Sequence, residues 1–250
     1  MSAERPSGSG GRRPTVVLAV TVVLGTVLLL WAAEWLARTG AGSILARSVQ
    51  ERTGVLERPT VQVHGGGSVL LQALRGRYDH VEVEVESLSS GPVRLRDFSA
   101  DLSGVYLSFQ DLLDGSTDRV FVERSVEEAL LTYDDLDRYL GFTGRPLDAE
   151  LAGDGQLRLA GTVDVLGEMR SVSALARVEP EDGALLVRPT ELTAIGPLEG
   201  VDELLVRQRF TFPVPLDPLL FEGRADELSV AVRPSGLELR ASGSSVVLAS

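Results

Sequence analysis

The chain has 250 residues, a net charge of −12 and no cysteine. A chain this acidic is not expected to bind nucleic acid, because phosphates attract clustered positive charge. Without cysteine no disulfide can stabilise it, so its stability has to come from a packed apolar core.

The N-terminal segment has the length of a membrane span. Residues 15–33 contain no charged side chain. A helix of this length, at about 1.5 Å per residue, spans roughly 28 Å, which matches a hydrocarbon core of about 30 Å. Trp31 and Trp35 lie where interfacial tryptophans are enriched. We therefore predict a signal-anchor helix over residues 15–36, preceded by a disordered tail over residues 1–14.

The charges that flank this helix predict its orientation. Arg12 and Arg13 precede it, so the positive-inside rule keeps the N-terminus in the cytoplasm. Residues 37–250 are then outside the cytoplasm, as one β-rich domain. A cleaved signal peptide is the alternative, although a cut after Ala33 would place bulky Trp31 where cleavage sites have a small residue.

A short amphipathic helix is expected next, over residues 43–53, and strand-like alternation follows from Thr60. The clearest strand is HVEVEVES, residues 80–87, in which three valines alternate with three glutamates. This period of two predicts a half-buried strand with its valines toward the core.

The remainder of the chain continues mainly as strands. Residues 93–109, 119–123 and 155–167 show further alternation, and two hairpins are predicted with turns at 181–183 and 234–236. One internal helix is expected from Thr132 to Leu140, because Thr132 can cap it and Asp135 has the capping-box spacing. Short turns favour antiparallel pairing. The predicted fold class is α+β and mainly antiparallel β.

Side chains that would support catalysis are scarce. There are only two histidines, His64 and His80, and no nucleophile stands in a recognisable catalytic motif. The acidic segment at 111–118 lacks the ligand spacing of a calcium-binding EF-hand loop. We therefore predict no enzymatic activity, no metal and no cofactor.

The order of several segments resembles a known family. Residues 61–85 read VQVHGGGSVLLQALRGRYDHVEVEV, and LRDFSADLSGV, ALLTYDDLDRYL, DGALLVRP and SGLELRASGSSVVL follow. This order is similar to that of the LmeA-like phospholipid-binding family of actinobacterial cell-envelope proteins, over residues 43–248. In one departure, Gly67, Ser68 and Val69 stand where the family usually has an aromatic-proline-aromatic stretch.

The resemblance implies a fold and a function. The expected fold is an elongated curved sheet wrapped around a helix, similar to tubular lipid-binding proteins, after one N-terminal transmembrane helix. The expected function is that of a membrane-anchored extracytoplasmic protein that binds phospholipid and supports envelope lipid or lipoglycan assembly. The alternative is a structural or scaffold protein of the envelope, with a self-filled core and no lipid ligand.

The candidate lipid-binding residues come from two sources. One is the segment at residues 69–77, which begins where the family usually has its aromatic-proline-aromatic stretch, and the other is a set of three phenylalanines. For the phosphate headgroup we predict Arg75 and Arg77, because a guanidinium can bind a phosphate with two hydrogen bonds. The residues predicted to contact acyl chains are Val69, Leu70, Leu71, Leu74, Phe98, Phe210 and Phe212.

The first prediction concerns the N-terminus. The protein recovered from the membrane fraction should retain residues 15–36, because their apolar run is long enough to span the bilayer and the cleavage site is poor. N-terminal sequencing of that protein decides the matter. A mature terminus near Ala33 or Glu34 would contradict the anchor and leave export intact.

Overall fold

A computed structural model describes most of the chain after residue 58. The predicted signal-anchor, the helix at 43–53 and the acidic segment at 111–118 lie outside the described residues. Within the described part, no helix is both long and apolar enough to cross a membrane. The described residues are 59–65, 68–90, 92–108, 119–165, 167–181, 183–194, 200–216 and 227–249.

The strands form two antiparallel sheets rather than the single sheet that we expected. The first is a curled half-barrel of six strands in the order β1-β2-β3-β4-β11-β10, and four of its strands are 14 residues long. Its strands are β1 (Thr60–His64), β2 (Arg77–Ser90), β3 (Val93–Tyr106), β4 (Arg119–Thr132), β10 (Glu227–Arg233) and β11 (Gly236–Ala249).

The second sheet has five strands in the order β5-β6-β7-β8-β9. Its last strand is an edge strand that contains two prolines, as expected for residues that cannot donate to a central ladder. The strands are β5 (Leu147–Leu151), β6 (Leu157–Val165), β7 (Glu168–Glu181), β8 (Ala184–Ala194) and β9 (Phe212–Pro215).

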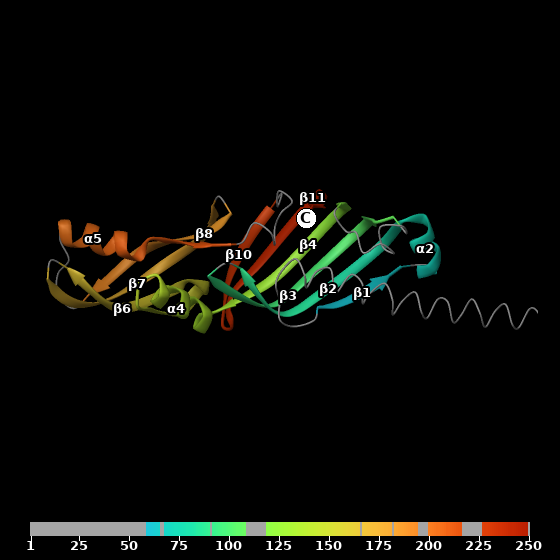
Figure 1. Cartoon of the computed structure of the whole chain (residues 1–250). Coiled ribbons are helices and arrows are strands. Elements are labelled where there is room, and N and C mark those ends of the chain that lie inside the picture. Colours follow the sequence, from blue (N-terminus) through green and yellow to red (C-terminus); the bar gives the residue numbers. More distant parts are fainter. Residues whose placement is uncertain are drawn as a thin grey trace, which may run out of the picture.

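Short helices lie at the ends and near the junction of this elongated molecule (Figure 1). The helix α2 (Val69–Arg75) lies at the end of the six-stranded sheet, and α5 (Val201–Phe210) lies at the far end of the five-stranded sheet. The helix α4 (Tyr133–Phe142) connects the two sheets and contacts β3, β4 and β5. A single 3-10 turn, η1 (Gly153–Gly155), precedes β6. One apolar core includes side chains from both sheets, α4 and α5.

The alternation on β2 places its valines inward, as predicted. Val81, Val83 and Val85 are each less than 10% exposed, whereas Glu84 and Glu86 are exposed. Each inward valine faces an apolar partner on β3; Val83, for example, pairs with Ala100. The inner face of the sheet is therefore apolar and its outer face is charged.

The cap of α4 contains a buried carboxylate. The hydroxyl of Thr132 accepts a hydrogen bond from the Asp135 backbone N–H (3.2 Å), which is the predicted capping arrangement. The Asp135 side chain has no exposed surface and lies 2.9 Å from the Nε of Arg96 on β3. Burial by itself would raise the pKa of Asp135, but hydrogen bonds from Arg96, Thr132 and Arg138 outweigh burial and lower it. The cap thus connects α4 to the six-stranded sheet.

Several predictions from the sequence are confirmed and others needed correction. The fold is mainly antiparallel, and the β7–β8 and β10–β11 hairpins turn where predicted. The helix predicted to end before Gly141 continues to Phe142. The helices α2 and α5 were not predicted. Residues 207–210 are the last turn of α5.

The register of β2 gives the second prediction. Val83→Asp should lower the free energy of unfolding by several kcal/mol, because it buries a carboxylate without a partner. Glu84→Gln changes an exposed side chain on the same strand, so it should alter stability by less than about 0.5 kcal/mol. Thermal melts of the two variants provide the comparison, and equal shifts would contradict the inward assignment of the valines.

Candidate lipid-binding site

The inner face of the six-stranded sheet is an extended apolar surface. Neighbouring strands contribute side chains to it in register: Val85 lies opposite Phe98, and Leu131 on β4 lies opposite Leu237 on β11. These four side chains are buried. Such a face suits an acyl chain, because apolar burial needs no specific polar partner.

One ionisable side chain interrupts this apolar face. Glu127 on β4 pairs with Ala100 on β3 and with Ala241 on β11, and both alanines belong to the inner face. Its Oε2 atom is buried and has no hydrogen-bond partner among the described residues. Desolvation raises the pKa of this carboxyl from 4.5 to about 7. Glu127 is therefore partly neutral at neutral pH.

The nearest neighbours of Glu127 on the inner face of the sheet are small. Ala100 and Ala241 lie beside it on the neighbouring strands, and Ser125 and Ala129 precede and follow it on the same face of β4. All four are buried. A carboxyl surrounded by small side chains is a place where another group can approach the sheet closely.

The structure places the predicted residues of α2 at one end of the molecule. Ser68 caps this helix by accepting a hydrogen bond from the Leu71 N–H, and Gly76 ends it in a left-handed conformation (φ 64°). Val69 is buried, whereas Leu71 and Leu74 are 50% and 61% exposed. The side chain of Leu70 lies outside the described part of the structure. Two exposed leucines on one short helix are candidates for contact with a partner or a membrane.

The predicted headgroup residues lie beside these leucines. Arg75 is exposed at the last turn of α2, and Arg77 begins β2. The guanidinium of Arg77 lies 3.3 Å from Glu123 and 5.1 Å from the ring centroid of Tyr106. Arg77 is thus already engaged by a carboxylate and an aromatic ring. Leu71, Leu74, Arg75 and Arg77 form one cluster, and their role in lipid binding stays a prediction.

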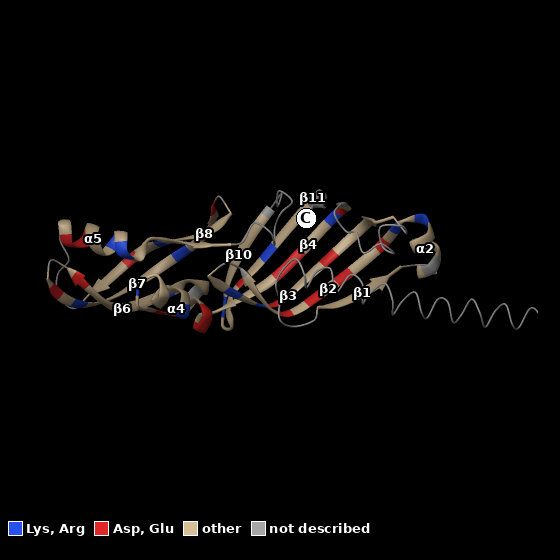
Figure 2. Ribbon diagram, viewed as in Figure 1, with Lys and Arg blue, Asp and Glu red and all other residues tan. Residues whose placement is uncertain are grey.

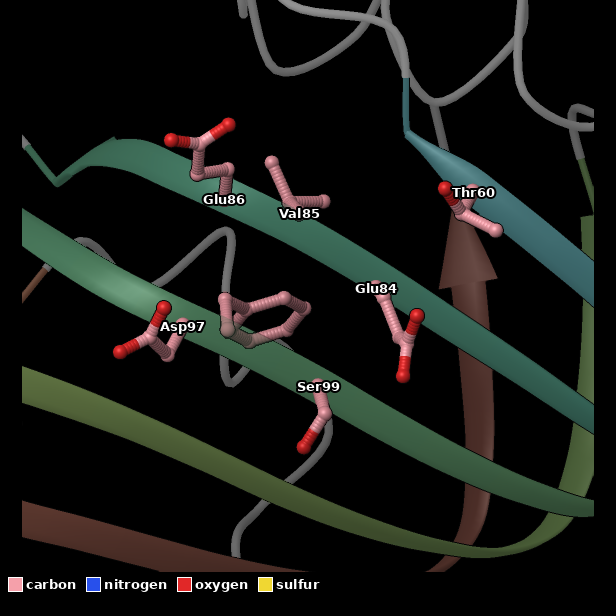
Figure 3. A pocket seen from close by; sticks show the side chains of 7 residues that line it. Thr60, Glu84, Val85, Glu86, Asp97 and Ser99 are labelled. Carbon is pink, nitrogen blue, oxygen red and sulfur yellow. The ribbon is translucent and has the colours of Figure 1, made fainter.

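Phe98 does not belong to that cluster. It lies about seven residues along β3 from Val105, the partner of Tyr78, which is roughly 23 Å at 3.3 Å per residue. A cavity of about 410 Å³ adjoins Phe98, and Glu84, Glu86 and Asp97 contribute carboxylates to its wall (Figure 3). The first two come from β2 and the third from β3. Three carboxylates repel a phosphate, so this cavity is a poor place for a lipid headgroup.

Phe210 and Phe212 lie in the other half of the molecule. Phe210 is the last residue of α5 and Phe212 the first of β9, and both are almost completely buried in the core against the five-stranded sheet. The structure therefore does not bring the three predicted phenylalanines together. Their spacing along the sequence gave no information on which sheet each would join.

Sequence reasoning missed Glu127, although a signal was present. Residues 125–131 read SVEEALL, in which Glu127 has the same parity as Ala129 and Leu131. That parity places one of the two adjacent glutamates on the apolar face. The pairing with β3 and β11 shows that it is Glu127, whereas Glu128 faces outward and pairs with Arg240 at 3.1 Å.

No group of three or more histidines or carboxylates arranged to hold a metal ion occurs among the residues that the structure describes.

Acidic side chains recur along β2, β3 and β4, which Figure 2 shows in red. The strongly charged outer surface and the apolar inner face are thus the two contrasting features of this sheet.

A family model described as LmeA-like phospholipid-binding matches residues 32–242. The chain belongs to this family. Comparison with curated proteins and with solved structures gave no match. Membership of the LmeA-like family agrees with the resemblance seen in the sequence and points to phospholipid as the ligand class.

The third prediction concerns the pH dependence of stability. Because the native-state pKa of Glu127 is raised, the folded protein binds a proton that the unfolded chain releases between pH 4.5 and about 7. The free energy of unfolding should therefore fall across this range, by up to about 3 kcal/mol from this group. Glu127→Gln should remove that fall and be more stable than the parent above pH 7.

Chemical denaturation at several pH values measures this effect. Glu128→Gln is the matched control, since it alters the adjacent carboxylate on the outer face. Its pH profile should follow that of the parent. A parental pH profile in Glu127→Gln would show that the carboxyl is not desolvated.

Proposed function

We propose that the chain is a membrane-anchored, extracytoplasmic phospholipid-binding protein whose six-stranded sheet takes acyl chains on its inner face. The family match over residues 32–242 carries this proposal. The apolar inner face supports it, because each CH₂ group buried there contributes about 0.8 kcal/mol. An acyl chain that buries several CH₂ groups can therefore bind without a charged motif.

The inner-face side chains are already covered in this structure. Val122, Leu131 and Leu239 have no exposed surface. An acyl chain must therefore displace whatever lies against them, and the small side chains around Glu127 are the place where this displacement needs the least rearrangement. The free-energy cost of placing Glu127 beside an acyl chain is lower for its neutral carboxyl than for its carboxylate.

The membrane location belongs to the same proposal. Residues 15–36 would hold the protein on the outer side of the cell membrane, with the N-terminus in the cytoplasm. Leu71 and Leu74, with Arg75 and Arg77 beside them, would meet lipid at the α2 end. A bound phospholipid at this location would serve envelope lipid or lipoglycan assembly.

A scaffold role is the second candidate, and the burial of most inner-face side chains favours it. A protein that fills its own core needs no lipid to be stable. Such a protein would present its charged outer strands to envelope enzymes. The two candidates differ in one observable, which is whether purified protein carries phospholipid.

The fourth prediction uses this difference. The full-length protein, purified in a detergent that does not extract tightly bound lipid, should carry phospholipid that mass spectrometry detects. Ala100→Leu adds bulk to the inner face beside Glu127, so it should reduce the bound phospholipid several-fold. Ser99→Leu, one residue earlier on β3 and not on that face, is the matched control and should leave the amount unchanged.

Overpacking can cost about 1–3 kcal/mol, so circular dichroism has to show that both variants fold. A folded parent that carries no phospholipid would support the scaffold instead.

A further inference from the structure

A second cavity lies at the other end of the molecule, beneath α5. The helix packs against β6 and β8. β5 pairs with β6 only as far as Gly161, so no described strand pairs with residues 162–165 of β6 on that side. A cavity of about 570 Å³ occupies this place, between α5, the end of β6 and the turn that joins α4 to β5.

Two arginines line this cavity without a carboxylate partner among the described residues. Arg145 lies in the turn, where its backbone N–H donates to the Leu140 carbonyl (2.8 Å). Its Nε is buried and has no hydrogen-bond partner in the described part of the chain, and its guanidinium lies 5.9 Å from the ring centroid of Phe212. Arg209, from the last turn of α5, donates one hydrogen bond to the Gly144 carbonyl. Both guanidinium groups therefore keep unused donors.

The other charges near the cavity do not neutralise these arginines. Asp164 contributes a carboxylate to the wall, and one of its oxygens accepts the Gly167 N–H at 2.7 Å. Arg207 on the same helix is paired with Glu203 at 2.9 Å. Figure 2 shows acidic residues at the beginning of α5 and basic residues at its end. Among the residues that line the cavity, the two arginines outnumber the one carboxylate, in a chain whose net charge is −12.

Large apolar side chains on α5 and at the start of β7 are exposed, and two of them line the cavity. On α5, Val201, Leu204 and Leu205 are 62%, 65% and 37% exposed, and their spacing places them on one side of the helix. Met169 at the start of β7 is 70% exposed and, with Leu205, lines the cavity. Exposed apolar side chains next to unpaired arginines have the chemistry of a membrane interface, where apolar groups insert and cations meet phosphate.

We propose that this end of the molecule docks onto a phospholipid bilayer, with the phosphate of a lipid headgroup bound in the cavity by Arg145 and Arg209. Val201, Leu204 and Met169 enter the boundary between headgroups and acyl chains. This inference rests on the proposed function and adds a membrane-facing site at the end opposite α2 (Figure 1). Neither arginine was among the headgroup residues predicted from the sequence.

The chemistry of the site limits its ligand to a phosphodiester within a lipid surface. A guanidinium can donate two parallel hydrogen bonds to a phosphate, and two guanidiniums can hold one phosphate from both sides. The apolar rim adds nothing to the affinity for free phosphate, but it does add to the affinity for a bilayer. Removing the rim therefore separates these two ligands.

The test is vesicle flotation with the full-length protein held in a peptide-stabilised disc. The vesicles are mixtures of phosphatidylcholine and phosphatidylglycerol. The double variant Arg145→Gln/Arg209→Gln should reduce the floated fraction at least fivefold. The matched control Arg158→Gln/Arg188→Gln removes two arginines that are ion-paired on the same sheet, and it should float as the parent does.

The apolar rim is tested separately. Val201→Ser/Leu204→Ser alters two exposed side chains, so it should keep the fold and still reduce flotation severalfold. Leu71→Ser/Leu74→Ser, at the α2 end, should reduce it less. The opposite result has two parts: excess inorganic phosphate abolishes flotation, and the rim variant floats as the parent does. That result would identify a free-anion site and overturn the docking proposal.

Lipid content, measured by mass spectrometry on the same preparations, separates the two proposals. A parent without bound phospholipid contradicts the proposed function. A parent that carries phospholipid, but whose flotation is the same with and without the two cavity arginines, contradicts only the docking site.

Discussion

The fold depends on one constraint, which is that a strongly curved six-stranded sheet must keep its apolar face inside and its charged face outside. Alternation on β2 satisfies this constraint because a shift of one residue would bury its glutamates in place of its valines. The four long strands extend the same division over most of their length. The second sheet continues the same core, so the molecule becomes long without losing its interior.

Two carboxyl groups on or beside this core have opposite environments. Asp135 receives hydrogen bonds from Arg96 and Arg138, and its pKa is lowered, so it stabilises the α4 cap as a carboxylate. Glu127 has no cation beside it among the described residues, and its pKa is raised. A buried carboxyl without a partner costs stability. Glu127 carries this cost in the middle of the apolar face against which the proposed ligand lies.

The sequence predicted those parts of the molecule that depend on local pattern. The valine–glutamate alternation of β2, the Thr132 cap and both hairpin turns follow from spacing and turn chemistry. The division into two sheets could not be predicted, because it depends on long-range pairing such as β4 with β11. The helix α5 was missed because its apolar residues lie on more than one side, with Val206 buried and Leu204 exposed. Arg145 and Arg209 are far apart in sequence, and only the packing of α5 brings them together.

The central claim is that acyl chains lie against the inner face of the six-stranded sheet. Photo-crosslinking tests it most directly, with a phospholipid that carries a diazirine in its acyl chain and with the full-length protein. After irradiation and proteolysis, adducts should appear on inner-face residues of β3, β4 and β11, including the neighbours of Glu127. Adducts confined to the outer face, at residues such as Glu84 or Arg240, would contradict the account.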